Sequence, residues 1–174
     1  MIDLRACSAA LVVAIGTWGA ALAGPGEDAG WSLSLDPRRR AFLIWRSQPG
    51  QARDLLVGCL RDVASFTARS ETLGSLGEAS RAQLVLTSGP MRFEAAGAIS
   101  RDQDNGQSIF DSEVDIDGVK GQALVRQLMP VLEGRGEIRL TISAKPDSSE
   151  IMSRNIPVAG LAPLLKRFRA VCFK

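Results

Sequence analysis

The sequence predicts a mainly antiparallel, sandwich-like β domain with two helices, the second of which packs on the sheet. Three observations lead to this fold class: apolar residues alternate over most of the chain, helical spacing appears in two segments, and turn sequences separate the alternating runs. The 174 residues are 45% hydrophobic and 23% charged, which excludes a disordered or collagen-like chain. We expect about seven to nine strands in one domain over residues 24–174.

Alternating or continuous apolar runs mark the candidate strands. They span residues 31–35, 41–45, 54–62, 65–70, 83–87, 91–101, 107–116, 137–143 and 151–158. The run at 54–62 is apolar on both faces, which is typical of a central strand covered on both sides. Asn105-Gly106 predicts a hairpin, and Gly97 predicts a bulge or a close backbone approach. The Gly- and Ser-bearing segment 72–80 is expected to be a loop.

Helical spacing begins at Val119. The apolar stripe of this first helix consists of Leu124, Val125, Leu128 and Leu132. Asp117 is a suitable N-cap, because its carboxylate can accept from the amides of the first turn. Pro130 is expected to end or kink the helix near residues 127–129.

A second helical stripe near the C-terminus predicts the helix that packs on the sheet. Its members are Leu161, Leu164, Leu165, Phe168, Val171 and Cys172. Pro163 falls in the first turn, where amide hydrogens have no helical partner. Lys166, Arg167 and Arg169 are expected on the outer faces, and cations near a helix C-terminus suit its dipole.

Residues 1–23 have the features of a secretory signal peptide. A polar opening with Arg5 precedes an apolar run over residues 6–22, and Ala21-Leu22-Ala23 is a small-x-small cleavage site. About 17 residues is near the lower length limit of a spanning helix, so an uncleaved membrane anchor is the alternative. The Ala and Gly content favours cleavage before Gly24. We therefore expect a periplasmic protein with no stable membrane span after cleavage.

The cysteines predict one disulfide. Cys7 leaves with the signal peptide, so Cys59 and Cys172 remain, and two cysteines in an exported chain favour a bridge. Two buried free thiols or an intermolecular pair are the alternatives. The helical stripe places Cys172 on a buried face, where it can meet Cys59 on the central strand.

The residue types present restrict the possible chemistry. The chain has no histidine, which excludes an imidazole base, a serine triad and a His-ligated metal. The net charge of +2 gives no basis for nucleic-acid binding. The acidic cluster Asp111–Gly118 has Leu124 where a calcium loop requires its last Glu, so we interpret it as the solvent face of a strand. We expect no catalytic residue, metal or cofactor.

Several segments together resemble a family of exported proteins. They are the early strand Leu55-x-Val57-x-Cys59, the step from acidic strand to helix at Asp117, and the ending Ile156–Cys172. In these the chain resembles small exported bacterial proteins of the type VI secretion-associated TagO/VasI kind. The ending Val158-Ala-Gly160-Leu is also similar to the tail of invasion-associated locus B proteins, whose second cysteine pair is lacking here. The resemblance implies a periplasmic β-sandwich accessory protein without catalytic residues.

The sequence therefore predicts a non-enzymatic accessory or binding protein of the cell envelope, with an envelope protein as its partner. Recognition is expected from hairpin loops, because loops on a rigid sandwich usually carry it. The candidate contact residues are Arg38, Arg39, Arg40, Asp102 and Asn105. The alternative is an envelope hydrolase that cleaves a glycan with two carboxylates, which would have to converge in a cleft at roughly 5–10 Å.

Overall fold

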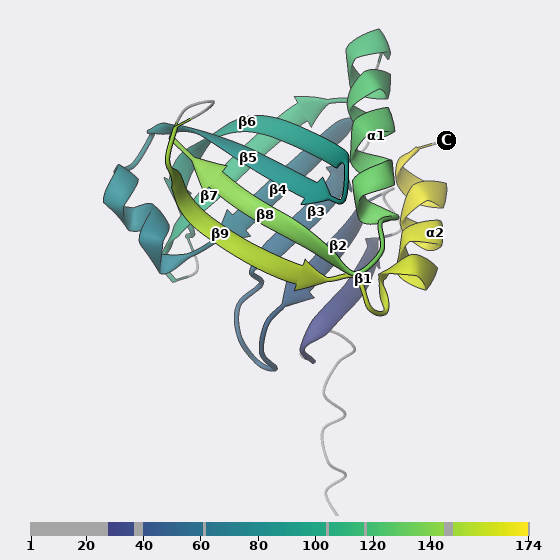
Figure 1. The fold of residues 1–174 in the computed structure, drawn as a ribbon, viewed down its shortest axis with the longest axis horizontal. Helices are drawn as coiled ribbons and strands as arrows, with labels where there is room; N and C mark the ends of the chain where they lie inside the picture. Colours follow the sequence, from purple (N-terminus) through teal and green to yellow (C-terminus); the bar gives the residue numbers. More distant parts are fainter. Residues whose placement is uncertain are drawn as a thin grey trace, which may run out of the picture.

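The computed structural model describes residues 28–36, 40–60, 62–103, 105–116, 118–144 and 148–173. The strands are β1 (Gly30–Asp36), β2 (Arg40–Arg46), β3 (Leu55–Leu60), β4 (Val63–Arg69), β5 (Arg81–Ser88), β6 (Met91–Arg101), β7 (Ser108–Asp115), β8 (Glu137–Ser143) and β9 (Glu150–Pro157). The helices are the 3-10 helix η1 (Glu71–Leu76), α1 (Gly118–Leu132) and α2 (Leu161–Cys172). The predicted fold class, mainly antiparallel β with a C-terminal helix on the sheet, is confirmed (Figure 1).

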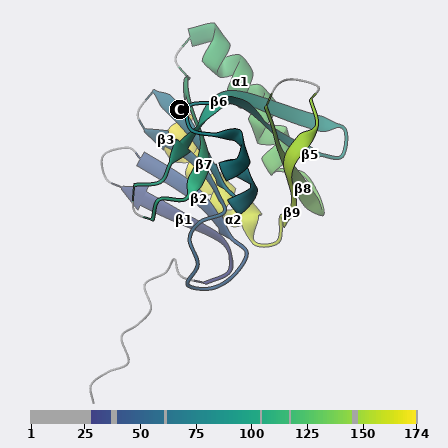
Figure 2. The same ribbon diagram turned by 90° about the vertical axis from the view of Figure 1, so that its left-hand side faces the viewer.

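The described strands form one antiparallel sheet in the order β1-β2-β3-β4-β7-β6-β5-β8-β9. β6 pairs with β7 only over residues 98–101, whereas it pairs with β5 over residues 91–98. The sheet bends at this point, so that β5, β8 and β9 face β1, β2, β3 and β7 across the core (Figure 2). The two edge strands meet at one end, where Trp31 Nε1 of β1 donates to the Pro157 carbonyl of β9 at 2.7 Å.

The bend depends on Gly97. A Cβ on this residue would lie 2.3 Å from the Asp111 carbonyl oxygen of β7 and 2.6 Å from the Phe110 ring. Real atoms do not approach so closely, so only glycine allows β6 to cross β7 here. The predicted close backbone approach at Gly97 is confirmed.

The core fills the space between the two halves of the bent sheet. Phe66 of β4 and Phe93 of β6 bring the halves together, with ring centroids 4.9 Å apart and both side chains fully buried. β3 is the central strand that the sequence predicts, since five of its six residues are buried. On its outer face, the Phe42 ring of β2 lies against Gly58, where a side chain would collide with it.

The two helices lie next to each other at one end of the sheet, opposite η1 (Figure 1). α1 packs against β6, and α2 packs against β2 and β1. The buried face of α2 consists of Leu161, Leu165, Phe168 and Cys172, as its stripe predicts. Cys172 forms the predicted disulfide with Cys59 of β3, with 5.8 Å between the Cα atoms. The bridge fixes the last turn of α2 to the centre of the sheet.

Of the two outcomes predicted for Pro130, the end of α1 near residues 127–129 is wrong, whereas a kink there stays a prediction. The helix continues to Leu132, although Pro130 cannot donate a hydrogen bond to the Arg126 carbonyl. Four residues around the proline are buried: Leu128, Met129, Val131 and Leu132. Burying these side chains stabilises the last turn by several kcal/mol, which exceeds the roughly 3 kcal/mol that a proline costs inside a helix.

The prediction of a plain loop over 72–80 is also wrong in its first half, where η1 forms. Ser70 caps this helix, because its Oγ accepts from the Thr72 amide at 3.3 Å. Leu73 is fully buried and anchors the short helix in the core. The cap and one apolar anchor were present in the sequence, but the surrounding Gly and Ser residues obscured the pattern.

Some predictions fall on residues outside the described ranges. These are the signal peptide over residues 1–23 with Cys7, the cap residue Asp117, and the contact residues Arg38 and Arg39. Within the described ranges, neither long helix has the length and apolar character needed to cross a membrane.

Candidate functional site

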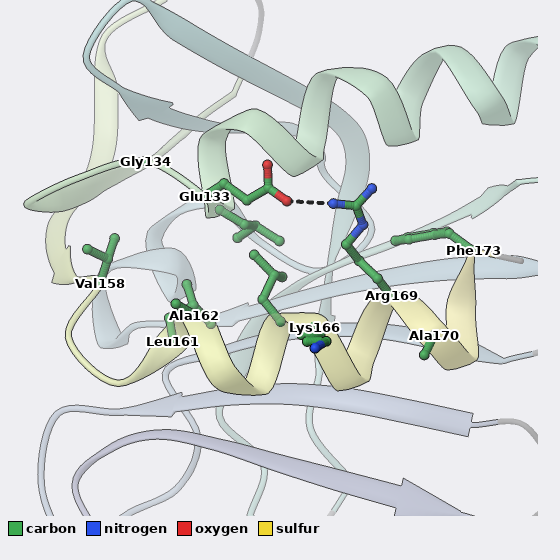
Figure 3. A pocket seen from close by; sticks show the side chains of 11 residues that line it. Glu133, Gly134, Val158, Leu161, Ala162, Lys166, Arg169, Ala170 and Phe173 are labelled. Atoms are coloured by element: carbon green, nitrogen blue, oxygen red, sulfur yellow. Dashed lines mark hydrogen bonds and ion pairs between the residues drawn. The ribbon is translucent and has the colours of Figure 1, made fainter.

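A pocket of about 530 Å³ lies between the end of α1 and one side of α2 (Figure 3). The end of α1 contributes Leu132 and Glu133, and the turn before α2 contributes Val158. The remaining wall is α2 itself. This volume lies in the range of roughly 300–1,000 Å³ that is usual for ligand sites in proteins.

The pocket exists because α2 has two adjacent stripes. The first is apolar and faces the sheet, as described above. The second runs along the side of the helix at spacings of three and four residues and includes Ala162, Lys166, Arg169 and Ala170, all exposed. Phe173 closes the far end, where its ring meets Phe168 edge-on at 5.8 Å. Small alanines therefore leave space between larger apolar groups.

The rim of the pocket carries two cations from α2 and one carboxylate from the residue that follows α1. Arg169 Nη1 of α2 donates to Glu133 Oε1 at 2.7 Å, and this ion pair ties α2 to the end of α1 (Figure 3). Both side chains are about half exposed, at 55% and 47%. Such a pair contributes less than about 1 kcal/mol in water, so another carboxylate can replace Glu133 at Arg169. Lys166 adds a second cation on the same side.

A second, polar cleft of about 600 Å³ lies at the other end of the sheet, where the β2–β3 loop, η1 and β9 meet. Asp54 forms an ion pair with Arg154 of β9 and accepts from the Ser47 amide at 2.6 Å. The Arg154 guanidinium also lies over the Trp45 ring, 5.8 Å from its centroid. These contacts close the bent sheet at this end.

The alternative hydrolase prediction requires two converging carboxylates in a cleft. Asp54 and Asp102 are the most enclosed acids in the ion pairs of the described chain, with side chains 13% and 11% exposed. Asp54 is engaged by Arg154 and Asp102 by Arg69. Each carboxylate thus holds an arginine in place, and activating a water would require one of these pairs to break.

The structure separates the predicted contact residues. Arg40 begins β2 opposite Leu60, whereas Asp102 follows β6 at the opposite end of the strands. Asp102 is paired with Arg69, and Asn105 accepts from the Gln107 amide at 3.0 Å within its own turn. Of the described contact residues, Arg40 and Asp102 therefore lie at opposite ends of the strands, and their contact with a partner stays a prediction.

The acidic strand has the arrangement that the sequence predicts. Asp111, Glu113 and Asp115 are exposed along β7, while Phe110 is fully buried on the other face. Thr67 of β4 donates to Asp111 at 3.1 Å. The part of the chain that the structure describes contains no group of three or more acidic or sulfur ligands placed to hold a metal ion.

Comparison with known proteins adds no relative. No family model, curated protein or solved structure matches this chain. The candidate site is therefore supported by its geometry alone, and the resemblance to TagO/VasI proteins stays a prediction.

The sequence did not indicate the pocket between the helices. Lys166 and Arg169 were expected on the outer faces of the last helix, and both are exposed. Glu133, the partner of Arg169, was not predicted, because α1 was expected to end or kink before it. The available signal was the pair of alanines at 162 and 170, which leave one side of α2 without bulk.

Proposed function

We propose that this chain is an exported accessory protein of the cell envelope that binds another envelope protein through the pocket between α1 and α2. The observation that carries the proposal is an apolar pocket with two cations on its rim, Lys166 and Arg169. Its wall is rigid, because the disulfide from Cys172 to Cys59 anchors α2 to the sheet. A rigid, preformed pocket loses little conformational entropy when a partner binds.

The lining suggests the chemistry of the partner segment. Leu132, Leu161 and Leu165 offer an apolar floor, while Arg169 holds a half-exposed carboxylate that a competing one can displace. A peptide segment with a large apolar side chain beside a carboxylate can cover this apolar floor and pair with Arg169. The C-terminal residue of a partner chain is the simplest group with this combination, because its α-carboxylate is close to its side chain.

Export is supported by two features. Residues 1–23 carry the pattern of a cleaved signal peptide, and the disulfide is of the kind that persists in an oxidising compartment. We propose a periplasmic location on these grounds. The resemblance to TagO/VasI proteins extends the proposal to a role in secretion, for which operon neighbours are the direct check.

Site-specific photo-crosslinking in the producing cells tests this function. A photoreactive residue at Ala170, which lines the pocket, is expected to capture one envelope protein as a discrete adduct. The same residue at Gln127, exposed on α1 outside the pocket, is the control and should give no such adduct. Equal adducts from both positions, or none while the purified protein degrades a cell-wall glycan, would overturn the proposal in favour of a hydrolase or of another surface.

A further inference from the structure

The polar cleft at the end of the sheet opposite α1 and α2 is built from segments that are far apart in the sequence. The β2–β3 loop, the end of β4 with η1, the β6–β7 turn and β9 all contribute side chains to it. Its volume of about 600 Å³ lies within the range that is usual for ligand sites. The mouth of a curled or closed sheet is also a common place for such a site.

The lining of this cleft is almost entirely polar. Of the residues that line it in the described part of the chain, Ala52 is the only one with an apolar side chain. The uncharged polar groups are amides and hydroxyls, from Gln48, Gln51, Gln107, Ser47, Ser70 and Thr72. An apolar ligand would strip water from these groups without replacing its hydrogen bonds. A ligand that fits must therefore carry donors and acceptors over most of its surface.

The charges of the cleft are balanced. Its cations in the described chain are Arg69 and Arg154, and each has a carboxylate partner. Arg154 pairs with Asp54, which also lines the cleft, and Arg69 pairs with Asp102. Glu71 adds an exposed carboxylate from η1. Because these residues carry no surplus of positive charge, they favour a ligand without net negative charge.

The fold holds the charged groups in position. Asp54 Oδ2 accepts from the Ser47 amide at 2.6 Å, and the Arg154 guanidinium lies over the Trp45 ring, 5.8 Å from its centroid. The Arg69 amide donates to the Asp54 carbonyl at 2.9 Å, which ties β4 to the β2–β3 loop. A guanidinium has five N–H donors and a carboxylate has about four acceptor positions, so the pair of Arg154 and Asp54 keeps capacity for a ligand.

A sugar has the chemistry that this lining requires. Each hydroxyl of a sugar ring can both donate and accept, and neighbouring hydroxyls can bind neighbouring donors and acceptors such as a guanidinium, a carboxylate or an amide. A peptide fits less well, because its apolar side chains would find no apolar surface beside Ala52. A phosphate or an acidic sugar would approach cations that carboxylates already neutralise.

We propose that this cleft binds a neutral saccharide without cleaving it. Asp54 and Arg154 contact ring hydroxyls, and the amides of Gln51 and Gln107 contact further hydroxyl or acetamido groups. Asp54 keeps its ion pair with Arg154 in the complex, so it does not activate a water. This site is separate from the pocket between the helices and does not depend on the protein partner proposed for that pocket.

A titration followed by two-dimensional NMR tests the binding. Isotope-labelled protein, purified after expression of the full chain, is titrated with triacetylchitotriose or with maltotriose. We expect saturable shifts at amides of the cleft such as Ser47 and Thr72, with a Kd of roughly 0.1–10 mM because each hydrogen bond replaces one to water. Saturation by either sugar supports the proposal, and the pair separates an amino sugar from a plain hexose as the source.

Two results of this titration would overturn the proposal. The first is the absence of saturable shifts with both neutral sugars up to about 50 mM, well above the expected Kd. The second concerns trigalacturonic acid, an anionic trisaccharide that should bind about tenfold more weakly than the better neutral sugar. Equal or tighter binding of this acid would identify an anion site instead.

Paired glutamine substitutions locate the site. Gln51→Ala/Gln107→Ala should weaken binding about tenfold by removing two amides, and it should fold because both side chains are exposed. Gln122→Ala/Gln127→Ala makes the same change at exposed positions of α1 outside the cleft, and its Kd should stay within about twofold of wild type. Equal losses in the two double variants would refute the cleft as the binding site.

Two further measurements separate this site from the other functions considered. Mass spectrometry of the sugar after incubation should find it intact, whereas shorter products would refute binding without cleavage and favour the hydrolase. Lys166→Glu, which alters the pocket between the helices, should leave saccharide binding unchanged. The variant Gln51→Ala/Gln107→Ala should leave crosslinking from Ala170 unchanged, so the two proposals can fail independently.

Discussion

Removing the disulfide gives the most quantitative test of how the fold is held together. Cys59 is fully buried in β3 and Cys172 is 8% exposed in α2, and 113 residues separate them. In the chain-entropy model, a loop of this length restricts the unfolded chain by about 5 kcal/mol, while measured values are usually about 2–4 kcal/mol. We expect Cys59→Ala/Cys172→Ala to lower the free energy of unfolding by about 2–4 kcal/mol.

Urea unfolding monitored by far-UV circular dichroism measures this difference. In a domain of this size, a loss of about 2–4 kcal/mol in the free energy of unfolding also lowers Tm by roughly 5–15 °C in thermal unfolding. Wild-type protein reduced with dithiothreitol should unfold at the same urea concentration as the double variant, because both lack the disulfide. Ellman titration of the denatured, oxidised mature protein should find no free thiol. Two free thiols, or a stability change below about 1 kcal/mol, would refute the claim that the bridge anchors α2.

Two further substitutions test the bend of the sheet and the end of α1. Gly97→Ala should destabilise the protein by about 2–3 kcal/mol in urea unfolding, because the new Cβ meets the Asp111 carbonyl. Gly106→Ala is the matched control: its φ of +69° is strained for alanine but its surroundings are open, so about 1 kcal/mol is expected. Pro130→Ala should stabilise the protein by about 1–2 kcal/mol by restoring a helical amide, and a loss of stability would contradict our interpretation of α1.

Local patterns predicted most of the fold. The strands alternate with period two, and β3 is apolar on both faces, so each strand was visible without knowledge of its neighbours. The stripe of α2 placed Cys172 towards the sheet and thereby predicted its bridge to Cys59. Gly97 could be recognised from local pattern too, because a glycine inside an alternating strand usually marks a bulge or a close backbone approach.

The elements that were missed depend on tertiary packing. α1 passes Pro130 because its last turn is buried against the sheet, and no local rule contains that energy. Because α1 was expected to end or kink before Glu133, neither this residue nor the pocket that it lines with Arg169 was predicted. The expected loop contacts stay a prediction, although the structure shows that Asn105 accepts from the Gln107 amide and that Asp102 pairs with Arg69.

The central claim is that the pocket between α1 and α2 binds a protein partner, and paired charge reversals test it most directly. Lys166 lines the pocket, whereas its neighbour Arg167 is exposed outside it, so Lys166→Glu and Arg167→Glu change the net charge equally at adjacent positions. The measurement is the Kd of each variant for the partner captured at Ala170. We predict that Lys166→Glu weakens binding about tenfold or more and that Arg167→Glu stays within about twofold of wild type. Equal losses in the two variants would contradict the claim, since they would show that only the overall charge of the helix matters.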